Sequence, residues 1–252
     1  MTVQVLIPMA GSGRPFETLG QSFPKPLVEI HGKPLVEYAV EGVRLSEPQR
    51  YIFVTGEAEV ARFELGSVLH LIAPDSRMFI AKNSTGGALC SALLAVDLLD
   101  PEQPLMVCNG DQYLRKGVTE RAINEFRERD LDVGILTFDA IHPRWSFARI
   151  DEETGLVVET AEKRPISRHA TVGVYYYRNA EMFIRSGVNA ILKNNCYNEQ
   201  FYICPSINEL ILEGCRVGAH AVGHDEFFAL GTPEDVQRFK SHAESAFFLK
   251  GS

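Results

Sequence analysis

VQVLIPMAGSGRPFETLGQSFPKPL (residues 3–27) begins with an apolar run of strand length that stops at Pro8. A loop of small residues, Met9 to Gly13, follows directly, and a second loop carries Lys25 between two prolines. Small residues let the backbone approach a ligand closely, and consecutive N–H groups after a strand form a nest for phosphate oxygens. The stretch therefore predicts a buried strand that ends in an anion-binding loop.

Outward from this strand, apolar runs alternate with segments of helical period, which is typical of an α/β protein with a mainly parallel sheet. The further predicted strands are residues 51–55, 69–73, 105–108, 133–138 and 216–222. The predicted helices are residues 34–43, 58–65, 87–99, 119–129, 180–192, 206–213 and a last one from 233. Short strands at 147–150, 157–160 and 171–177 predict a small antiparallel insertion that covers the ligand edge of the sheet.

The composition fits one Rossmann-like, three-layer α/β/α domain, because 252 residues with 45% hydrophobic side chains can bury a sizeable core. The net charge of −8, with no run of Lys or Arg, argues against a nucleic-acid surface. No apolar stretch approaches the ~20 residues of a membrane span. The N-terminus lacks the features of a signal peptide, and five cysteines without Cys-x-x-Cys spacing predict reduced thiols and no zinc site. We expect a cytoplasmic protein.

The small-residue loop has competing interpretations. A dinucleotide fingerprint would need glycine at position 16, which is Phe16, and a Walker loop would need Gly-Lys-Ser/Thr, which is absent. A phosphate nest and a plain turn both remain open for the loop alone.

Two charged residues point to chemistry at the same edge of the sheet. Lys25 lies between Pro24 and Pro26, whose rings fix their φ angles, so its side chain extends from a stiff backbone that suits a catalytic cation. The alternative is an ordinary solvent-exposed loop lysine. Asp111 follows the predicted strand 105–108, where open α/β folds bind ligands. A carboxylate there suits Mg²⁺, which takes one or two protein carboxylates; an aspartate that caps a turn is the alternative.

A second charged pair, Glu162-Lys163, follows the predicted strand 157–160. It could receive a hydroxyl and a phosphate together, or form a charged surface turn. Aromatic residues at Trp145 and Tyr175 to Tyr177 could stack on a sugar ring or surround a quaternary ammonium, with core packing as the alternative.

Seven short motifs, in this order along almost the whole chain, resemble the sugar nucleotidyltransferase family, the pyrophosphorylases that join an NTP to a sugar 1-phosphate. They are Pro8-Met9-Ala10-Gly11-Ser12-Gly13, Phe23-Pro24-Lys25-Pro26-Leu27, Thr85-Gly86-Gly87-Ala88, Asn109-Gly110-Asp111, Glu162-Lys163, Gly173-Val174-Tyr175 and Leu230-Gly231-Thr232-Pro233-Glu234-Asp235.

The resemblance implies roles for individual residues. The implied catalytic residues are Lys25, Arg14 and Asp111, with Asp111 holding Mg²⁺ as cofactor. The implied nucleotide-binding residues are Met9, Ala10, Gly11, Ser12, Gly13, Thr85, Gly86, Gly87 and Asn109. The implied substrate-binding residues are Ser146, Glu162, Lys163, Gly173 and Glu199. The implied layout of residues 1–252 is a nucleotide-binding half (about 1–140), an acceptor-binding part (141–232) and a C-terminal helix (233–252).

The implied reaction is an in-line displacement in which a phosphate oxygen of the acceptor attacks the α-phosphorus of the NTP and pyrophosphate leaves. Because the nucleophile is already an anion, no general base is needed, and catalysis consists of positioning and charge neutralisation. The expected partners are an NTP, with CTP or UTP/dTTP favoured over purines, and a small phosphorylated acceptor. Such an enzyme would serve nucleotide-sugar supply for capsule or cell-surface polysaccharide. Homo-oligomerisation is left open.

Two positions depart from the family pattern. Arg14 arrives one place early and is followed by Pro15, which removes a backbone N–H. In the family pattern, Ala229 stands where many members carry a second metal-binding aspartate. Asp225 or Glu226 could substitute for it, so we expect either one Mg²⁺ held by Asp111 or a site whose second carboxylate is Asp225. Two alternatives follow: a nucleotide-binding member that acts as sensor or inactive subunit, and a glycosyltransferase, whose usual Asp-x-Asp pair is here reduced to the single Asp111.

Overall fold

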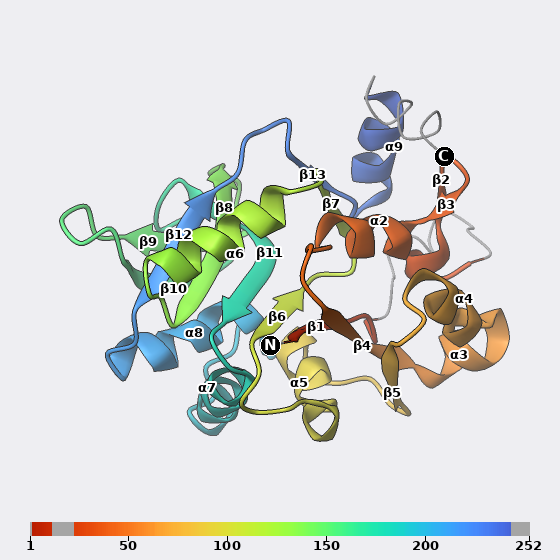
Figure 1. Ribbon diagram of the computed structural model, residues 1–252, viewed down its shortest axis with the longest axis horizontal. Helices are drawn as coiled ribbons and strands as arrows, with labels where there is room; N and C mark the ends of the chain where they lie inside the picture. Colours follow the sequence, from red (N-terminus) through yellow and green to blue (C-terminus); the bar gives the residue numbers. More distant parts are fainter. Residues whose placement is uncertain (1, 12–22, 243–252) are drawn as a thin grey trace.

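The computed structural model describes residues 2–11 and 23–242. Within these residues, one nine-stranded mixed sheet is covered by helices on both faces (Figure 1). The strands are β1 Val3–Pro8, β2 Glu29–Ile30, β3 Lys33–Pro34, β4 Gln49–Gly56, β5 Arg77–Ala81, β6 Leu105–Cys108, β7 Gln112–Leu114, β8 Val133–Asp139, β9 Ser146–Ile150, β10 Val157–Glu162, β11 His169–Tyr177, β12 Val217–Ala221 and β13 Phe227–Ala229. The helices are η1 Lys25–Leu27, α2 Leu35–Gly42, α3 Glu57–Phe63, α4 Leu65–Ile72, α5 Ala88–Leu93, η2 Val96–Leu98, α6 Val118–Glu128, α7 Ala180–Leu192, α8 Ile203–Leu212 and α9 Pro233–Ser241.

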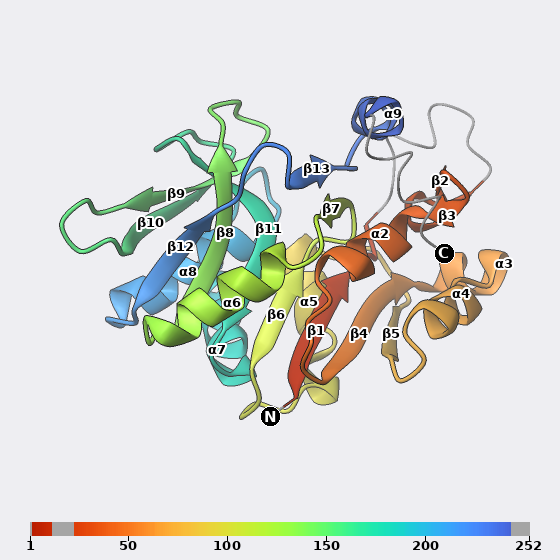
Figure 2. The same ribbon diagram turned by 45° about the horizontal axis from the view of Figure 1, so that its top comes forward.

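The sheet runs in the order β10-β9-β11-β6-β1-β4-β5, with β8 paired to β11 and β12 to β8 (Figure 2). Strand β1 pairs in parallel with both β4 and β6. Because a parallel strand with neighbours on both sides is buried on both faces, its sequence is almost continuously apolar, as in Val3 to Ile7. The predicted mainly parallel α/β fold is confirmed.

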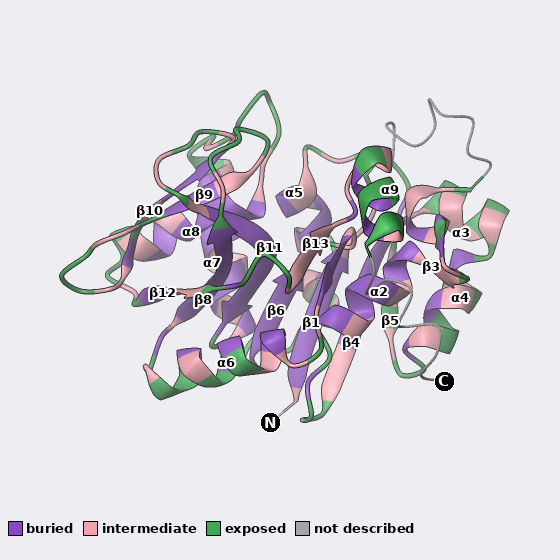
Figure 3. Cartoon of the chain, turned by 90° about the horizontal axis from the view of Figure 1, so that it is seen from above, coloured by how far each residue is buried: buried purple, intermediate pink, exposed green. Residues whose placement is uncertain are grey.

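Two hydrophobic clusters fill the space between the sheet and its helices. One cluster joins α2 and α6 to one face, with Val40 and Phe126 fully buried, and the other joins α5, α7 and α8 to the opposite face through Leu89, Phe183 and Ile207. Figure 3 shows the buried strands between more exposed helices. The three-layer arrangement follows from this division.

The predicted strand at residues 69–73 is wrong. These residues belong mostly to α4, in which Leu65 and Leu69, four residues apart, form the buried face. The spacing of four is helical, and the short apolar run concealed it. The strand that follows β4 in the sheet is β5, an edge strand with partly exposed residues. The predicted helix at 87–99 is also divided, because α5 ends at Leu93 and a separate 3₁₀ turn follows.

The antiparallel strands do not form a cover over the sheet. Strand β11 lies inside the sheet, antiparallel to both β6 and β8, and the β9–β10 hairpin extends the same sheet at its edge (Figure 2). Because β11 runs in reverse, its first residues reach the edge at which β1 and β6 end. No helix in the described ranges is long and apolar enough to cross a membrane.

Candidate active site

A cavity of about 550 Å³ opens where β1 and β6 end, at the edge of the sheet where open α/β folds bind ligands. Met9 and Gly11 line it after β1, and Asn109 and Asp111 line it after β6. The backbone of Met9 donates a hydrogen bond to Val54 of the neighbouring strand, which fixes the start of the first loop. Two predicted ligand segments therefore meet at one cavity.

Lys25 and Asp111 form an ion pair on the wall of this cavity, although they are 86 residues apart in sequence. Lys25 begins the 3₁₀ helix η1, and Pro24 and Pro26 on either side restrict its backbone. Both side chains remain partly exposed to the cavity. A cation and a carboxylate are thus held together where phosphates would enter.

The donor set at Asp111 suits a hard divalent cation that is bound mainly by substrate oxygens. Within the described residues, no group of three or more His, Cys, Asp or Glu side chains converges to hold a metal. Mg²⁺ needs only one or two protein carboxylates when phosphates and water complete its shell. Asp111, which lines the cavity, therefore fits Mg²⁺ brought with a triphosphate.

Asp225 does not reach this place, which corrects its assignment as the second metal ligand. Strand β13 pairs antiparallel with β7 so that Ala229 lies opposite Gln112 and Phe227 lies opposite Leu114. Residues before Phe227 therefore continue away from Asp111, and the Asp225 side chain is 74% exposed on a turn, 3.8 Å from Arg115. The register excludes Asp225 from the cavity wall.

The opposite wall comes from the β9–β10 hairpin, in which Ser146 pairs with Glu162. The Ser146 hydroxyl is hydrogen-bonded to Glu162 Oε2, and only 8% of Glu162 is exposed. Burial raises the pKa of the Glu162 carboxyl, against the opposing effects of Ser146 and Lys163. Lys163 donates its backbone N–H to Trp145 O at 3.0 Å and its Nζ to the Tyr202 hydroxyl at 3.1 Å.

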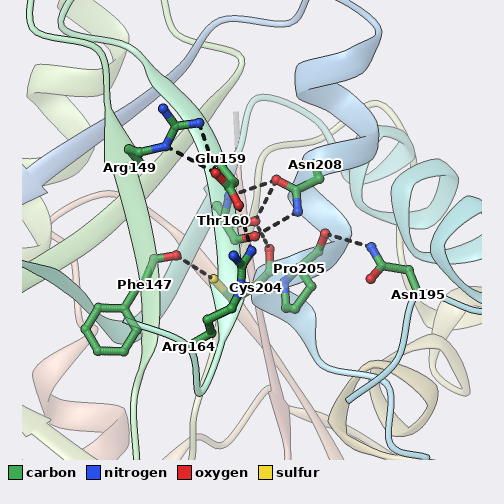
Figure 4. Close-up of polar contacts among 9 residues, drawn as sticks. All are labelled: Phe147, Arg149, Glu159, Thr160, Arg164, Asn195, Cys204, Pro205 and Asn208. Atoms are coloured by element: carbon green, nitrogen blue, oxygen red, sulfur yellow. Dashed lines mark hydrogen bonds and ion pairs between the residues drawn. The ribbon is translucent and has the colours of Figure 1, made fainter. Parts of the chain in front are cut away.

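Helix α8 holds this wall in place through the strand residue Thr160 (Figure 4). The Asn208 side chain accepts from Thr160 N and donates to Thr160 O, both at 2.8 Å. Thr160 Oγ1 also donates to Cys204 O at 2.8 Å. Because these bonds satisfy the edge of β10 just before Glu162, the position of Glu162 is set by the fold.

The sequence profile of the MobA-like NTP transferase domain matches residues 5–178, which include the first loop, Lys25, Asp111 and Glu162. The chain belongs to this family. The match confirms the resemblance to nucleotidyltransferases found in the sequence motifs.

The chain is also similar to curated proteins. Bifunctional protein GlmU from Burkholderia thailandensis is 25% identical over 244 residues, which cover 93% of this chain and 50% of GlmU. GlmU from Burkholderia orbicola gives the same identity and coverage. The chain thus spans about half the length of the curated relatives it matches.

Solved structures share the fold of this chain. The nucleoside-diphosphate-sugar pyrophosphorylase from Vibrio cholerae RC9 superposes with a TM-score of 0.82 at 24% identity, over 94% of this chain and all of that one. A UDP-glucose pyrophosphorylase complexed with UDP-glucose gives a TM-score of 0.77 at 17% identity, over 99% of this chain and 100% of that one.

The remaining predicted site residues differ in their position relative to the cavity. Asn109 N donates to Gly173 O at 2.8 Å, so Gly173 supports the cavity edge behind its lining neighbour Val172. Glu199 lies on an exposed turn before α8 with a φ of +59°, and it is not among the described residues that line the cavity. Three predicted residues lie outside the described ranges: Ser12, Gly13 and Arg14.

The predicted base turn, Thr85 to Gly87, immediately precedes Ala88, which lines the cavity. Phe201 N donates to Gly86 O at 2.7 Å, and Leu89 N donates to Phe201 O at 3.1 Å. Gly87 has φ +124° and ψ 178°, a conformation that only glycine adopts readily. The turn is therefore fixed against the segment that enters α8.

Gly87→Ala should lower the free energy of unfolding by about 2–4 kcal/mol, from backbone strain and overpacking together. A Cβ atom at Gly87 would lie 2.4 Å from Phe201 O and 2.7 Å from Phe201 N. Urea unfolding measures the change. The control is Gly66→Ala in α4, where the nearest atom is the flexible end of Met78 at 3.2 Å, and a change within about 1 kcal/mol is expected. Equal stability of the two variants would contradict the strain argument.

Several residues that line the cavity were given no site role from the sequence. Arg144, Tyr202 and Asp235 all line the cavity. Asp235 belongs to a capping pattern, in which Thr232 begins α9 and accepts a hydrogen bond from Asp235 N. The capping pattern predicts where α9 begins. It does not predict that this end of α9 lines the cavity.

Proposed function

We propose that the enzyme is a Mg²⁺-dependent nucleotidyltransferase that couples an NTP to a sugar 1-phosphate or another small phosphorylated metabolite, with release of pyrophosphate. The observation that carries this proposal is the single cavity that joins the Lys25–Asp111 pair to Ser146, Glu162 and Lys163. The first pair suits a triphosphate with its metal, and the second group suits a phosphate and a hydroxyl.

In the proposed step, an oxygen of the acceptor phosphate forms a bond to the α-phosphorus of the NTP. The bond from that phosphorus to the α,β-bridging oxygen breaks, and pyrophosphate leaves with the electron pair. When bound at Asp111, Mg²⁺ would offset phosphate charge during this exchange. The Lys25 ammonium neutralises charge on the reacting phosphates, Lys163 holds the acceptor phosphate, and Glu162 accepts from an acceptor hydroxyl.

No group of the protein has to remove a proton from the nucleophile. The acceptor phosphate is already anionic, so the obstacle is repulsion between two phosphates, which fixed cations overcome. This agrees with the described cavity lining, in which no histidine appears.

One of the structural comparisons supports a particular class of nucleotide. A structural relative was solved with UDP-glucose bound, which supports a pyrimidine nucleotide. We therefore propose CTP or UTP/dTTP before purines, a role in nucleotide-sugar supply for capsule or cell-surface polysaccharide, and a cytoplasmic reaction. All five cysteines are free thiols, which supports a reducing location. Homo-oligomer formation stays a prediction. Analytical ultracentrifugation of the purified chain tests it.

Pyrophosphate release requires Mg²⁺ together with both substrates. A thermal-shift screen of the four NTPs with Mg²⁺ selects the nucleotide, since a ligand of the native state raises the melting temperature. Phosphate esters are then added to the selected NTP, and pyrophosphate is measured with and without EDTA. We expect release that EDTA abolishes and added Mg²⁺ restores. Release that persists in EDTA would contradict the metal requirement.

A second candidate is a family member that binds nucleotide without turning it over, and Ala229 in place of a second carboxylate favours it. Calorimetry distinguishes the two. Tight NTP binding without pyrophosphate from a broad set of phosphate esters would establish this candidate and reject the first.

A further inference from the structure

Arg144, in the loop between β8 and β9, lines both the 550 Å³ cavity and an adjoining cavity of about 290 Å³. Its guanidinium carbon lies 4.1 Å from the centroid of the Trp145 ring. Its Nη1 donates to both carboxylate oxygens of Asp235, at 3.2 and 3.4 Å. The guanidinium plane is thus held between an aromatic face and a carboxylate.

Asp235 is a fixed partner. Its side chain is only 6% exposed, and the Thr232 hydroxyl donates to its Oδ2 at 2.9 Å. Arg144, by contrast, is 39% exposed. Among the described residues, no hydrogen-bond acceptor is found for its Nε or Nη2. One nitrogen anchors the group, and the other two are directed to no protein partner within the described ranges.

The cation lies between the metal side and the acceptor side of the cavity. A methyl group at Gly231 would lie 3.4 Å from Asp111 Oδ2 and 4.0 Å from Asp235 Oδ2, so Asp235 and its partner Arg144 adjoin the metal side. Arg144 is also two residues before Ser146, which bonds Glu162. Lys163 extends in another direction, toward Tyr202 on α8.

We propose that Arg144 is a further substrate-binding residue that donates through Nε and Nη2 to the phosphate group of the acceptor. A guanidinium presents two parallel N–H donors that match two phosphate oxygens, and a prearranged guanidinium loses less freedom on binding. Arg144 belongs to the acceptor wall, because Trp145 O accepts from Lys163 N. The inference rests on the proposed function and adds a second cation to the acceptor phosphate.

Arg144→Gln tests the assignment, because glutamine keeps a donor for Asp235 and loses the charge. The KM for the acceptor should rise at least about tenfold, with the KM for the NTP changed by less than about twofold. Arg144→Lys keeps the positive charge but lacks the two parallel N–H donors, so its KM for the acceptor should lie between those of the wild type and Arg144→Gln. The control is Arg168→Gln, which removes an exposed guanidinium paired with Asp139 outside the cavity lining and should leave both KM values unchanged.

An unchanged acceptor KM in Arg144→Gln, or a rise confined to the KM for the NTP, would overturn the inference and leave the proposed function standing. A lower melting temperature with unchanged KM values would show that Arg144 only ties α9 to the β8–β9 loop. If the wild-type chain releases no pyrophosphate, the proposed function fails. Calorimetry with inorganic phosphate then tests separately whether Arg144 binds a phosphate group. About fivefold weaker phosphate binding by Arg144→Gln supports the inference, and equal binding rejects it.

Discussion

Asp111→Asn should lower the rate of pyrophosphate release by at least about 10²-fold at saturating substrates and Mg²⁺. The amide has nearly the same shape but no charge, so it holds the metal weakly and leaves phosphate repulsion uncompensated. Steady-state pyrophosphate measurement gives the change in kcat. Because the Asp111 side chain is partly exposed, the variant should remain folded, which its thermal melting checks.

The matched control is Asp225→Asn. It removes the same charge from a carboxylate that the β7–β13 register keeps away from the cavity. Its kcat should stay within about twofold of the wild type, since an exposed charge contributes little. A rate loss in Asp225→Asn as large as in Asp111→Asn would show that both carboxylates serve the metal and that the register is not retained during the reaction.

Lys25→Met should also lower kcat by at least about 10²-fold, because the ammonium that neutralises the reacting phosphates is lost while a long side chain is kept. Lys33→Met is the control: Lys33 is similarly exposed, but it pairs with Glu37 and Glu41 outside the cavity lining. Normal turnover in Lys25→Met would remove Lys25 from the mechanism.

The two variants differ in their dependence on Mg²⁺. Asp111→Asn should need a higher Mg²⁺ concentration, whereas Lys25→Met should not, since its loss does not change the donor set of the metal. A Mg²⁺ titration of both variants separates a metal ligand from a charge-neutralising cation. Identical Mg²⁺ dependence would show that the pair acts as one unit.

Much of the fold could be predicted because its main signals are local. The apolar residues of β1 follow from burial between two parallel neighbours, and α7 was predicted with its observed bounds because Met182, Phe183 and Ala190 keep helical spacing. Residues 69–73 were assigned wrongly because a short apolar run has no distinct period. Only the packing of Leu65 and Leu69 against the core decides that they are helical.

Site residues whose role depends on their own chemistry could be predicted from the sequence. Residues whose position depends on strand register could not. The pairing of Lys25 with Asp111 agrees with the expectation that both lie at the edge of the sheet where β1 and β6 end. Asp225 looked suitable because it is near Ala229 in sequence, but antiparallel pairing places it beyond Leu114. Arg144 was assigned no role from the sequence, because its contact with Asp235 joins residues 91 positions apart.

The reversed strand β11 connects the two sides of the cavity. It is hydrogen-bonded to β6, which carries Asp111 at its end, and to β9, which begins at Ser146. The register of β11 against β8 shifts between Thr171 and Tyr175, where Gly173 has a φ of +92°, so the strand is irregular between these two contacts. In the proposed reaction, the distance between the two substrates depends on this irregular stretch of β11, so acceptors would be selected by their length as well as by their chemical groups.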